Sequence, residues 1–167
     1  MTDKNYAKDQ AAAQLSSIRE MLNALNCDYD RMNELREQLT AHEEEHGVSD
    51  FKKAYPSDFE KLESLTDAAG ECTSQDDAQQ RIQEDPLSVQ VRSDWINVGE
   101  DFAAEEFEIL LCTGGPAVRI LGELDEHNQP SRAFMQYQDW GTPWTDYYEE
   151  GVGSTCLEYA QQFYFGD

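Results

Sequence analysis

The residues His42, Glu43 and His46 form the string H-E-x-x-H within AHEEEHG. In zinc peptidases this spacing places two histidines on one helical face, with a glutamate base beside the metal. A peptidase of this kind also needs a third ligand, and Gly47-Val48-Ser49-Asp50-Phe51 contains no histidine. We therefore interpret the string as the solvated end of a helix, where histidines suit the local dipole. His42 and His46 are kept only as weak metal candidates.

Other sets of catalytic residue types are equally incomplete. Cys112 stands before the turn Gly114-Gly115, but His127 is placed across the adjacent hairpin, too far to serve as its base. No glycine-rich phosphate loop occurs, and carboxylates are so numerous that no acid/base pair is distinguished. We expect no catalytic residues, no cofactor and no enzyme activity, with a zinc-dependent hydrolase that uses the HEEEH string as the alternative.

The cysteines point to the compartment. Cys27, Cys72, Cys112 and Cys156 are widely spaced, which leaves a zinc site with Cys27 or Cys72 open but does not favour one. The polar start MTDKNYAKDQ is unlike a secretory signal, and no apolar run approaches the roughly 20 residues that span a membrane. These features predict reduced thiols and a cytoplasmic location, with no membrane partner.

Acidic residues dominate the composition. The 167 residues include 35 Asp and Glu against 12 Lys and Arg, a formal net charge of −23. Residues 1–86 hold 20 acids and 9 bases, and residues 87–167 hold 15 acids and 3 bases, so the acidity is not confined to a tail. Such a field repels nucleic acid and attracts basic protein surfaces. General solubility or salt adaptation would also produce it, although the 18 aromatic residues exceed what solubility requires.

The first half of the chain has helical periodicity. Residues 1–46 lack glycine and proline, which predicts one long helix, or a helical hairpin broken near Asn26-Cys27-Asp28, ending at Gly47. A capping box at Ser57-Asp58-Phe59-Glu60 predicts a helix to Gly70, and Ser74 predicts a short helix that ends before Pro86. A heptad-like stripe could form a homodimer, and its members are Leu15, Ile18, Leu22, Leu25, Met32, Leu35 and Leu39.

After Pro86 the pattern changes to strand alternation. Residues 87–91, 107–111, 118–124 and 133–137 alternate in this way, with a hairpin turn at Gly114-Gly115 and a bulge expected at Gly122. A terminal helix framed by Thr155 and Glu158 would turn Leu157, Ala160 and Phe163/Tyr164 inward. The chain is thus predicted to be α+β: a helical region over 1–86, and over 87–167 an antiparallel sheet of about four strands with a C-terminal helix. We expect one compact domain with a helical extension.

Two surfaces are candidates for partner binding. Carboxylates spaced three or four residues apart on a helix lie about 5–6 Å from one another, and such a row can occupy a groove built for nucleic-acid phosphates. The alternative is a solvated helix face. The acidic candidates are Glu34, Glu37, Glu43, Glu44, Glu45, Asp50, Asp58, Glu60, Glu63 and Asp67. The second surface is aromatic and comprises Trp140, Trp144, Tyr147 and Tyr148, types favoured as interface anchors, although the tryptophans could instead close the core.

The run from Leu110 to Trp144, LLCTGGPAVRILGELDEHNQPSRAFMQYQDWGTPW, and the ending YAQQFYFGD resemble small acidic proteins carried on bacterial plasmids, integrative elements and phages. The resemblance covers roughly the C-terminal half and implies anti-defence cargo, such as an anti-CRISPR protein. It leads us to expect a non-enzymatic inhibitor in the host bacterial cytoplasm. Its partner would be a basic surface of a CRISPR effector or restriction complex, with no direct nucleic-acid binding. A dimeric accessory protein of a mobile element is a further alternative.

Overall fold

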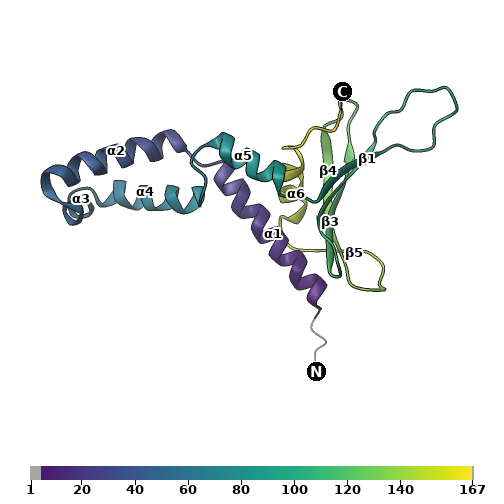
Figure 1. Ribbon diagram of the computed structural model, residues 1–167, viewed down its shortest axis with the longest axis horizontal. Coiled ribbons are helices and arrows are strands. Elements are labelled where there is room, and N and C mark those ends of the chain that lie inside the picture. Colours follow the sequence, from purple (N-terminus) through teal and green to yellow (C-terminus); the bar gives the residue numbers. More distant parts are fainter. Residues whose placement is uncertain (1–4, 167) are drawn as a thin grey trace. The chain divides into compact units, whose positions relative to one another are not determined.

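The computed structural model describes residues 5–166, apart from the side chains of residues 48 and 49. It is an α+β protein, as predicted, with two compact units. We call residues 20–80 the helical unit, and residues 1–19 with 81–167 the sheet unit. Helices α1 (Tyr6–Leu25) and α5 (Gln75–Glu84) contribute to both (Figure 1). Within the described residues, no helix has the length and apolarity to cross a membrane.

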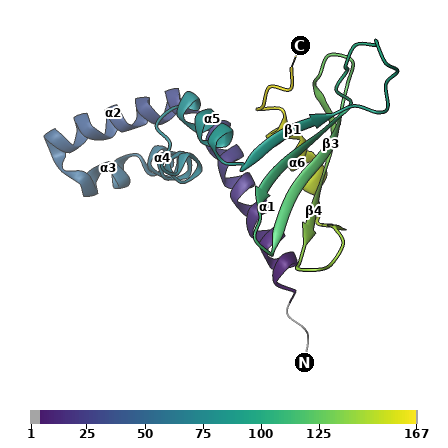
Figure 2. The same cartoon turned by 45° about the vertical axis from the view of Figure 1, so that its right-hand side comes forward.

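The helical unit is built on α2 (Tyr29–His46), α3 (Val48–Ala54) and α4 (Pro56–Ala69). Helices α2 and α4 lie side by side in both Figures 1 and 2, with α3 at the turn between them. Their inner faces bury Met32, Leu35, Leu62 and Leu65. Of the two possibilities for residues 1–46, the broken helix is confirmed. Asp28 ends the break by capping α2, where its Oδ1 accepts a hydrogen bond from the Arg31 N–H at 3.0 Å.

Two predictions about helix starts have different outcomes. The prediction of a capping box at Ser57 is wrong. Helix α4 begins one residue earlier, with Pro56 in its first turn and no side-chain cap at Tyr55. Proline has no N–H to satisfy and its fixed φ suits the first helical turn, so the cap is dispensable. Ser74 does cap α5, accepting from the Asp77 N–H at 3.1 Å. The seven-residue α3 was not predicted.

The leucine stripe is not available to a second copy. Leu15, Ile18, Met32 and Leu35 have no exposed surface, and only Leu39 is half-buried. The free energy gained by burying these side chains is already used within one chain. A homodimer would therefore need another surface.

The sheet unit contains one antiparallel sheet whose strands follow chain order (Figure 2). The first four strands agree with the predicted alternation, and a two-residue fifth strand adds to the predicted four. The strands are β1 (Ser88–Arg92), β2 (Glu106–Cys112), β3 (Ala117–Leu124), β4 (Pro130–Gln138) and β5 (Thr145–Asp146).

Helix α6 (Val152–Ala160) covers one face of this sheet, mainly over β4. The covered face buries Phe107, Ile109, Ile120 and Met135. From α6 the buried side chains are Cys156, Tyr159 and Ala160. The predicted inward position of Ala160 is confirmed, and Leu157 and Phe163 are half-buried, with the Phe163 ring centroid 5.3 Å from that of Tyr159. The prediction is wrong for Tyr164, which is exposed because the helix ends at Ala160. Tyr159 is buried instead and its hydroxyl donates to Asp85 at 2.7 Å.

The bulge predicted at Gly122 is also wrong. Gly122 pairs regularly with Phe107 and Ala133, and the register of β3 shifts one step later, between Glu123 and Leu124. Glycine is needed here for a different reason: a Cβ would overlap the Phe107 ring and the Arg132 carbonyl oxygen. Glycine at position 122 therefore reflects the close approach of a buried ring to the backbone, and not a bulge.

Candidate interaction surfaces

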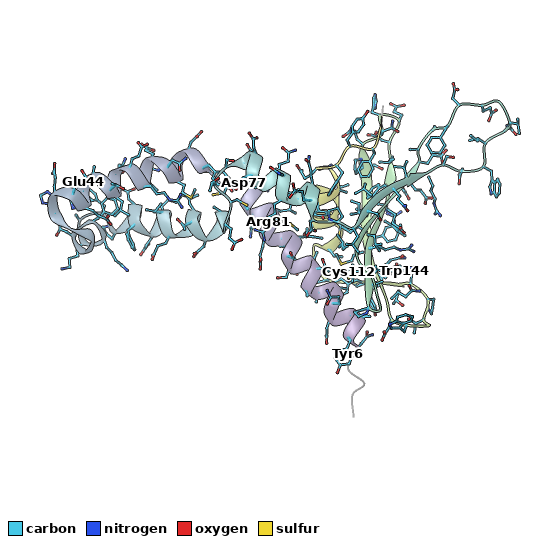
Figure 3. All side chains as sticks on the ribbon, in the orientation of Figure 1. Tyr6, Glu44, Asp77, Arg81, Cys112 and Trp144 are labelled. Atoms are coloured by element: carbon cyan, nitrogen blue, oxygen red, sulfur yellow. The ribbon has the colours of Figure 1, made fainter. Side chains whose placement is uncertain are left out.

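The predicted acidic residues all lie in the helical unit, mostly on the solvent sides of α2 and α4. On α2, Glu37 and Glu44 are exposed, two turns apart, opposite the buried face that carries Leu35. Glu44 stands near the end of α2 in Figure 3. Among the described residues, neither carboxylate has an ion-pair partner. These two groups can meet an external cation without losing an internal one.

Helix α4 presents a second exposed row. Glu60, Glu63 and Asp67 recur every three or four residues opposite the buried Leu62 and Leu65. No ion pair involves the three carboxylates within the part of the chain that the structure describes. With Glu37 and Glu44 they form what we call the free-carboxylate set.

The other acidic candidates are engaged locally or partly covered. Asp58 accepts from Arg31 at 3.3 Å, and Arg31 also binds Glu34 at 2.6 Å. Asp58 therefore faces α2 and is not in the exposed row of α4. The remaining candidates are half-buried Glu43, Glu45 beside His46 at 3.5 Å, and Asp50 beside His42 at 3.2 Å.

The histidines of the HEEEH string pack against aromatic rings. The His42 ring centroid is 4.9 Å from that of His46 and 5.6 Å from those of both Phe51 and Tyr55. Its Nε2 lies 3.2 Å from Asp50 Oδ2. Within the described residues, no group of three potential ligands surrounds this pair or any other point. These contacts explain the position of His42 by packing against rings near the turn between α2 and α4.

Cys112 lies at the end of β2, paired with Val118 at the start of β3 (Figure 3). His127 follows the far end of β3, about 20 Å along the strand. Burial raises the pKa of the Cys112 thiol, an effect partly offset by hydrogen bonds from the Val118 N–H and the Gln10 side chain. A thiol with a raised pKa, this far from the histidine, is a poor nucleophile.

The aromatic candidates near residues 140–148 divide into two pairs. Tyr147 is buried, and the Trp144 ring stacks on the Arg119 guanidinium at 4.1 Å. Trp140 and Tyr148 are exposed, at 78% and 80%. Trp140 also lies over Gly115, where a Cβ would overlap its indole. The four residues therefore do not form one continuous contact surface.

The sheet face not covered by α6 holds a groove of about 460 Å³. All three basic residues of 87–167 line it, each beside a glutamate: Arg92 with Glu106, Arg119 with Glu108, and Arg132 with Glu123. Arg119 is the most constrained, since Gln136 Oε1 accepts from two of its nitrogens at 2.8 and 3.0 Å. The groove is charge-balanced inside an acidic unit, and cross-strand pairing explains the positions of its arginines.

Sequence reasoning missed one surface, the connection between β1 and β2. We call residues 93–105 the β1–β2 loop. Trp95 and Val98 have relative exposures of 103% and 108%, and Phe102 is 61% exposed. In Figure 1 the loop projects beyond the ends of its two strands. The signal that could have found this surface is the string DWINVGEDF, which combines an aromatic pair with a glycine turn in a connection that carries four acids.

Comparisons of the chain with protein-family models, curated proteins and solved structures give no significant match.

Proposed function

We propose that this protein is a non-enzymatic inhibitor of a nucleic-acid-targeting bacterial defence complex. The free-carboxylate set would bind the basic surface on which that complex holds nucleic acid, by mimicry or occlusion. A CRISPR effector is the first target to test and a restriction enzyme the second. The observation that carries the proposal is the exposure of five carboxylates along α2 and α4 that have no counter-ion among the described residues.

Charge and spacing support this mode of binding. The helical unit holds 16 acids and 5 bases, so its local field is strongly negative. Neighbouring carboxylates in the set lie one or two helical turns apart, a spacing at which lysines and arginines of a phosphate-binding groove can meet several at once. Such association should be fast and should weaken as salt rises. The resemblance of the C-terminal half to mobile-element cargo favours a defence target.

The proposal is tested by competition for DNA. Purified CRISPR effector complexes and restriction enzymes are each given a fluorescent target duplex, and anisotropy measures the bound fraction as the protein is added. We expect the protein to displace or exclude DNA from at least one complex, more effectively at 50 than at 300 mM salt.

Two charge-matched variants make the assay specific. The test variant neutralises two carboxylates on each helix: Glu37→Gln, Glu44→Gln, Glu60→Gln and Glu63→Gln. The control variant removes the same charge elsewhere: Asp9→Asn, Glu20→Gln, Glu126→Gln and Glu150→Gln. We expect the test variant to lose about tenfold or more in inhibitory potency and the control to change little. Equal loss in both would show that only net charge matters and would contradict the proposed surface.

A further inference from the structure

The exposed side chains of the β1–β2 loop are unusual for their size. Trp95 and Val98 are as exposed as in an extended peptide. Ile96 and Phe102 are 44% and 61% exposed. Scattered exposed apolar residues are ordinary, but here four fall within eight residues of one loop, and we call this group the apolar patch. Tryptophan in particular is enriched among side chains that anchor protein interfaces. The patch belongs entirely to the sheet unit.

The loop is held in shape by its own hydrogen bonds. At the tip, the Glu100 carboxylate accepts from the backbone N–H and the side-chain amide of Asn97, each at 3.1 Å. These bonds lower the pKa of Glu100. At the base, the Glu105 N–H donates to the Arg92 carbonyl at 2.9 Å, beside the ion pair of Arg92 and Glu106. An apolar tip held in a defined turn loses less conformational entropy on binding than an unstructured segment.

Acidic side chains surround the apolar tip. Asp94, Asp101 and Glu105 are exposed and have no ion-pair partner among the described residues, and Glu100 stays within the turn. Their charge disfavours an anionic lipid surface, as does the net charge of −23. It equally disfavours a second copy of this acidic chain. The surface that complements the loop is apolar at its centre and basic at its rim.

We propose that the β1–β2 loop is an anchor that inserts Trp95 and Val98 into an apolar pocket of a partner protein edged by lysine or arginine. The pocket buries the two side chains while Asp94, Asp101 and Glu105 meet its basic rim. Burial of the tryptophan supplies most of the affinity and the acids speed the encounter. This inference stands on the sheet unit and does not require the free-carboxylate set to bind.

Site-specific photocrosslinking tests the anchor in the full chain. Val98 is replaced by p-benzoylphenylalanine in protein produced in bacterial cells, and the cells are irradiated. The matched control carries the same amino acid at Trp140, an exposed tryptophan at the opposite end of the sheet. We expect a discrete protein adduct from position 98 and none of that mass from position 140. The peptide joined to position 98 should be apolar and flanked by lysine or arginine.

The partner identified in this way is then purified and its affinity measured by titration. Trp95→Ala should weaken binding about 30-fold, and Trp140→Ala should leave it unchanged. Neutralising Asp94, Asp101 and Glu105 to their amides should slow association about tenfold and flatten its salt dependence.

Other occupants give opposite results. Equal adducts from positions 98 and 140, or an adduct whose peptide lacks basic residues, would overturn the anchor. So would Trp95-dependent dimerisation by light scattering, or Trp95-dependent sedimentation with phosphatidylcholine or phosphatidylserine vesicles. If the quadruple test variant of α2 and α4 keeps the position-98 adduct but no longer inhibits, the anchor stands independently. If position 98 gives no adduct while the test variant loses inhibition, the anchor fails and the proposed function stands.

Discussion

The helical unit and the sheet unit carry almost the same net charge but expose different side chains. The helical unit holds 16 acids and 5 bases, and the sheet unit 19 and 7. Ten of the eleven exposed large hydrophobic residues found among the described residues belong to the sheet unit, and the helical unit has only Tyr55. The helical unit is therefore suited to long-range, salt-sensitive attraction, and the sheet unit to short-range contact. Net charge alone would not have separated these two roles.

The two units can be followed by different signals. All three tryptophans, Trp95, Trp140 and Trp144, lie in the sheet unit, so tryptophan fluorescence reports on that unit. Far-ultraviolet ellipticity at 222 nm reports mainly on helices, most of which are in the helical unit.

The largest effect is expected from Phe107→Ala in the sheet unit. Phe107 is 1% exposed, and its ring centroid lies 4.9 Å from that of Phe165. The substitution opens a cavity and should lower the free energy of unfolding by about 3–5 kcal/mol. Urea unfolding followed by tryptophan fluorescence measures the cost. The exposed Phe102→Ala serves as control and should cost less than about 0.5 kcal/mol. Equal costs would mean that the covered sheet face is not the core.

The corresponding change in the helical unit is Leu35→Ala. Leu35 has no exposed surface, and its truncation should cost about 2–5 kcal/mol, measured by ellipticity at 222 nm in urea. Half-buried Leu39→Ala on the same helix should cost clearly less. A larger cost at Leu39 would place the buried face of α2 elsewhere.

A smaller effect should follow from Gly122→Ala. The added methyl group would meet the Phe107 ring and the Arg132 carbonyl, so we expect a loss of about 1–3 kcal/mol in the fluorescence-detected transition. Gly153→Ala in α6 is the matched control, because a Cβ there comes no closer than 3.5 Å to the Ala133 carbonyl oxygen. A Gly122→Ala variant as stable as the control would refute the close packing of Phe107.

Removing the cap of α2 should lower the free energy of unfolding by about 1 kcal/mol. Asp28→Ala deletes the acceptor of the Arg31 N–H, and the loss should appear in the ellipticity of the helical unit. Asp30→Ala, in the first turn but not at the cap, should cost less. If the two variants lose the same stability, general charge near the helix start would explain both.

The smallest effect concerns pH. Hydrogen bonds from the backbone N–H groups of Gln129 and His127 lower the pKa of Asp125. A carboxylate whose folded pKa is lowered stabilises the fold above its ordinary pKa, and this contribution is lost as pH falls through the lowered value. Urea midpoints between about pH 5 and 2.5 should therefore fall less in Asp125→Asn than in wild type. Glu126→Gln is the control. If the profile of Asp125→Asn runs parallel to that of the wild type, the Asp125 carboxylate does not contribute to the pH dependence of stability.

Much of the fold followed from local patterns. The alternation around Ile109 and Ile120 and the break before Tyr29 could be predicted because burial on one face leaves a regular period. Helix α3 spans only seven residues, too few to show a period. The reason for Gly122 was hidden because Phe107 belongs to another strand.

The candidate surfaces were less predictable. Exposed carboxylates such as Glu37 and Glu63 could be expected, since charged residues at helical spacing opposite a buried face point to solvent. Trp144 was taken for a contact residue, and its stacking on Arg119 joins positions 25 apart that only the sheet brings together. Trp95 was overlooked because the exposure of an aromatic residue in a loop depends on whether segments distant in the sequence cover it.

The central claim, that the free-carboxylate set acts on a defence complex, is tested most directly by phage plating. Bacteria with CRISPR immunity against a phage would express the wild-type protein, the quadruple test variant of α2 and α4, or its charge-matched control. The account predicts that the wild type and the control restore plaques and that the test variant does not. If the test variant restores plaques as well as the wild type, the helical unit does not carry the inhibition.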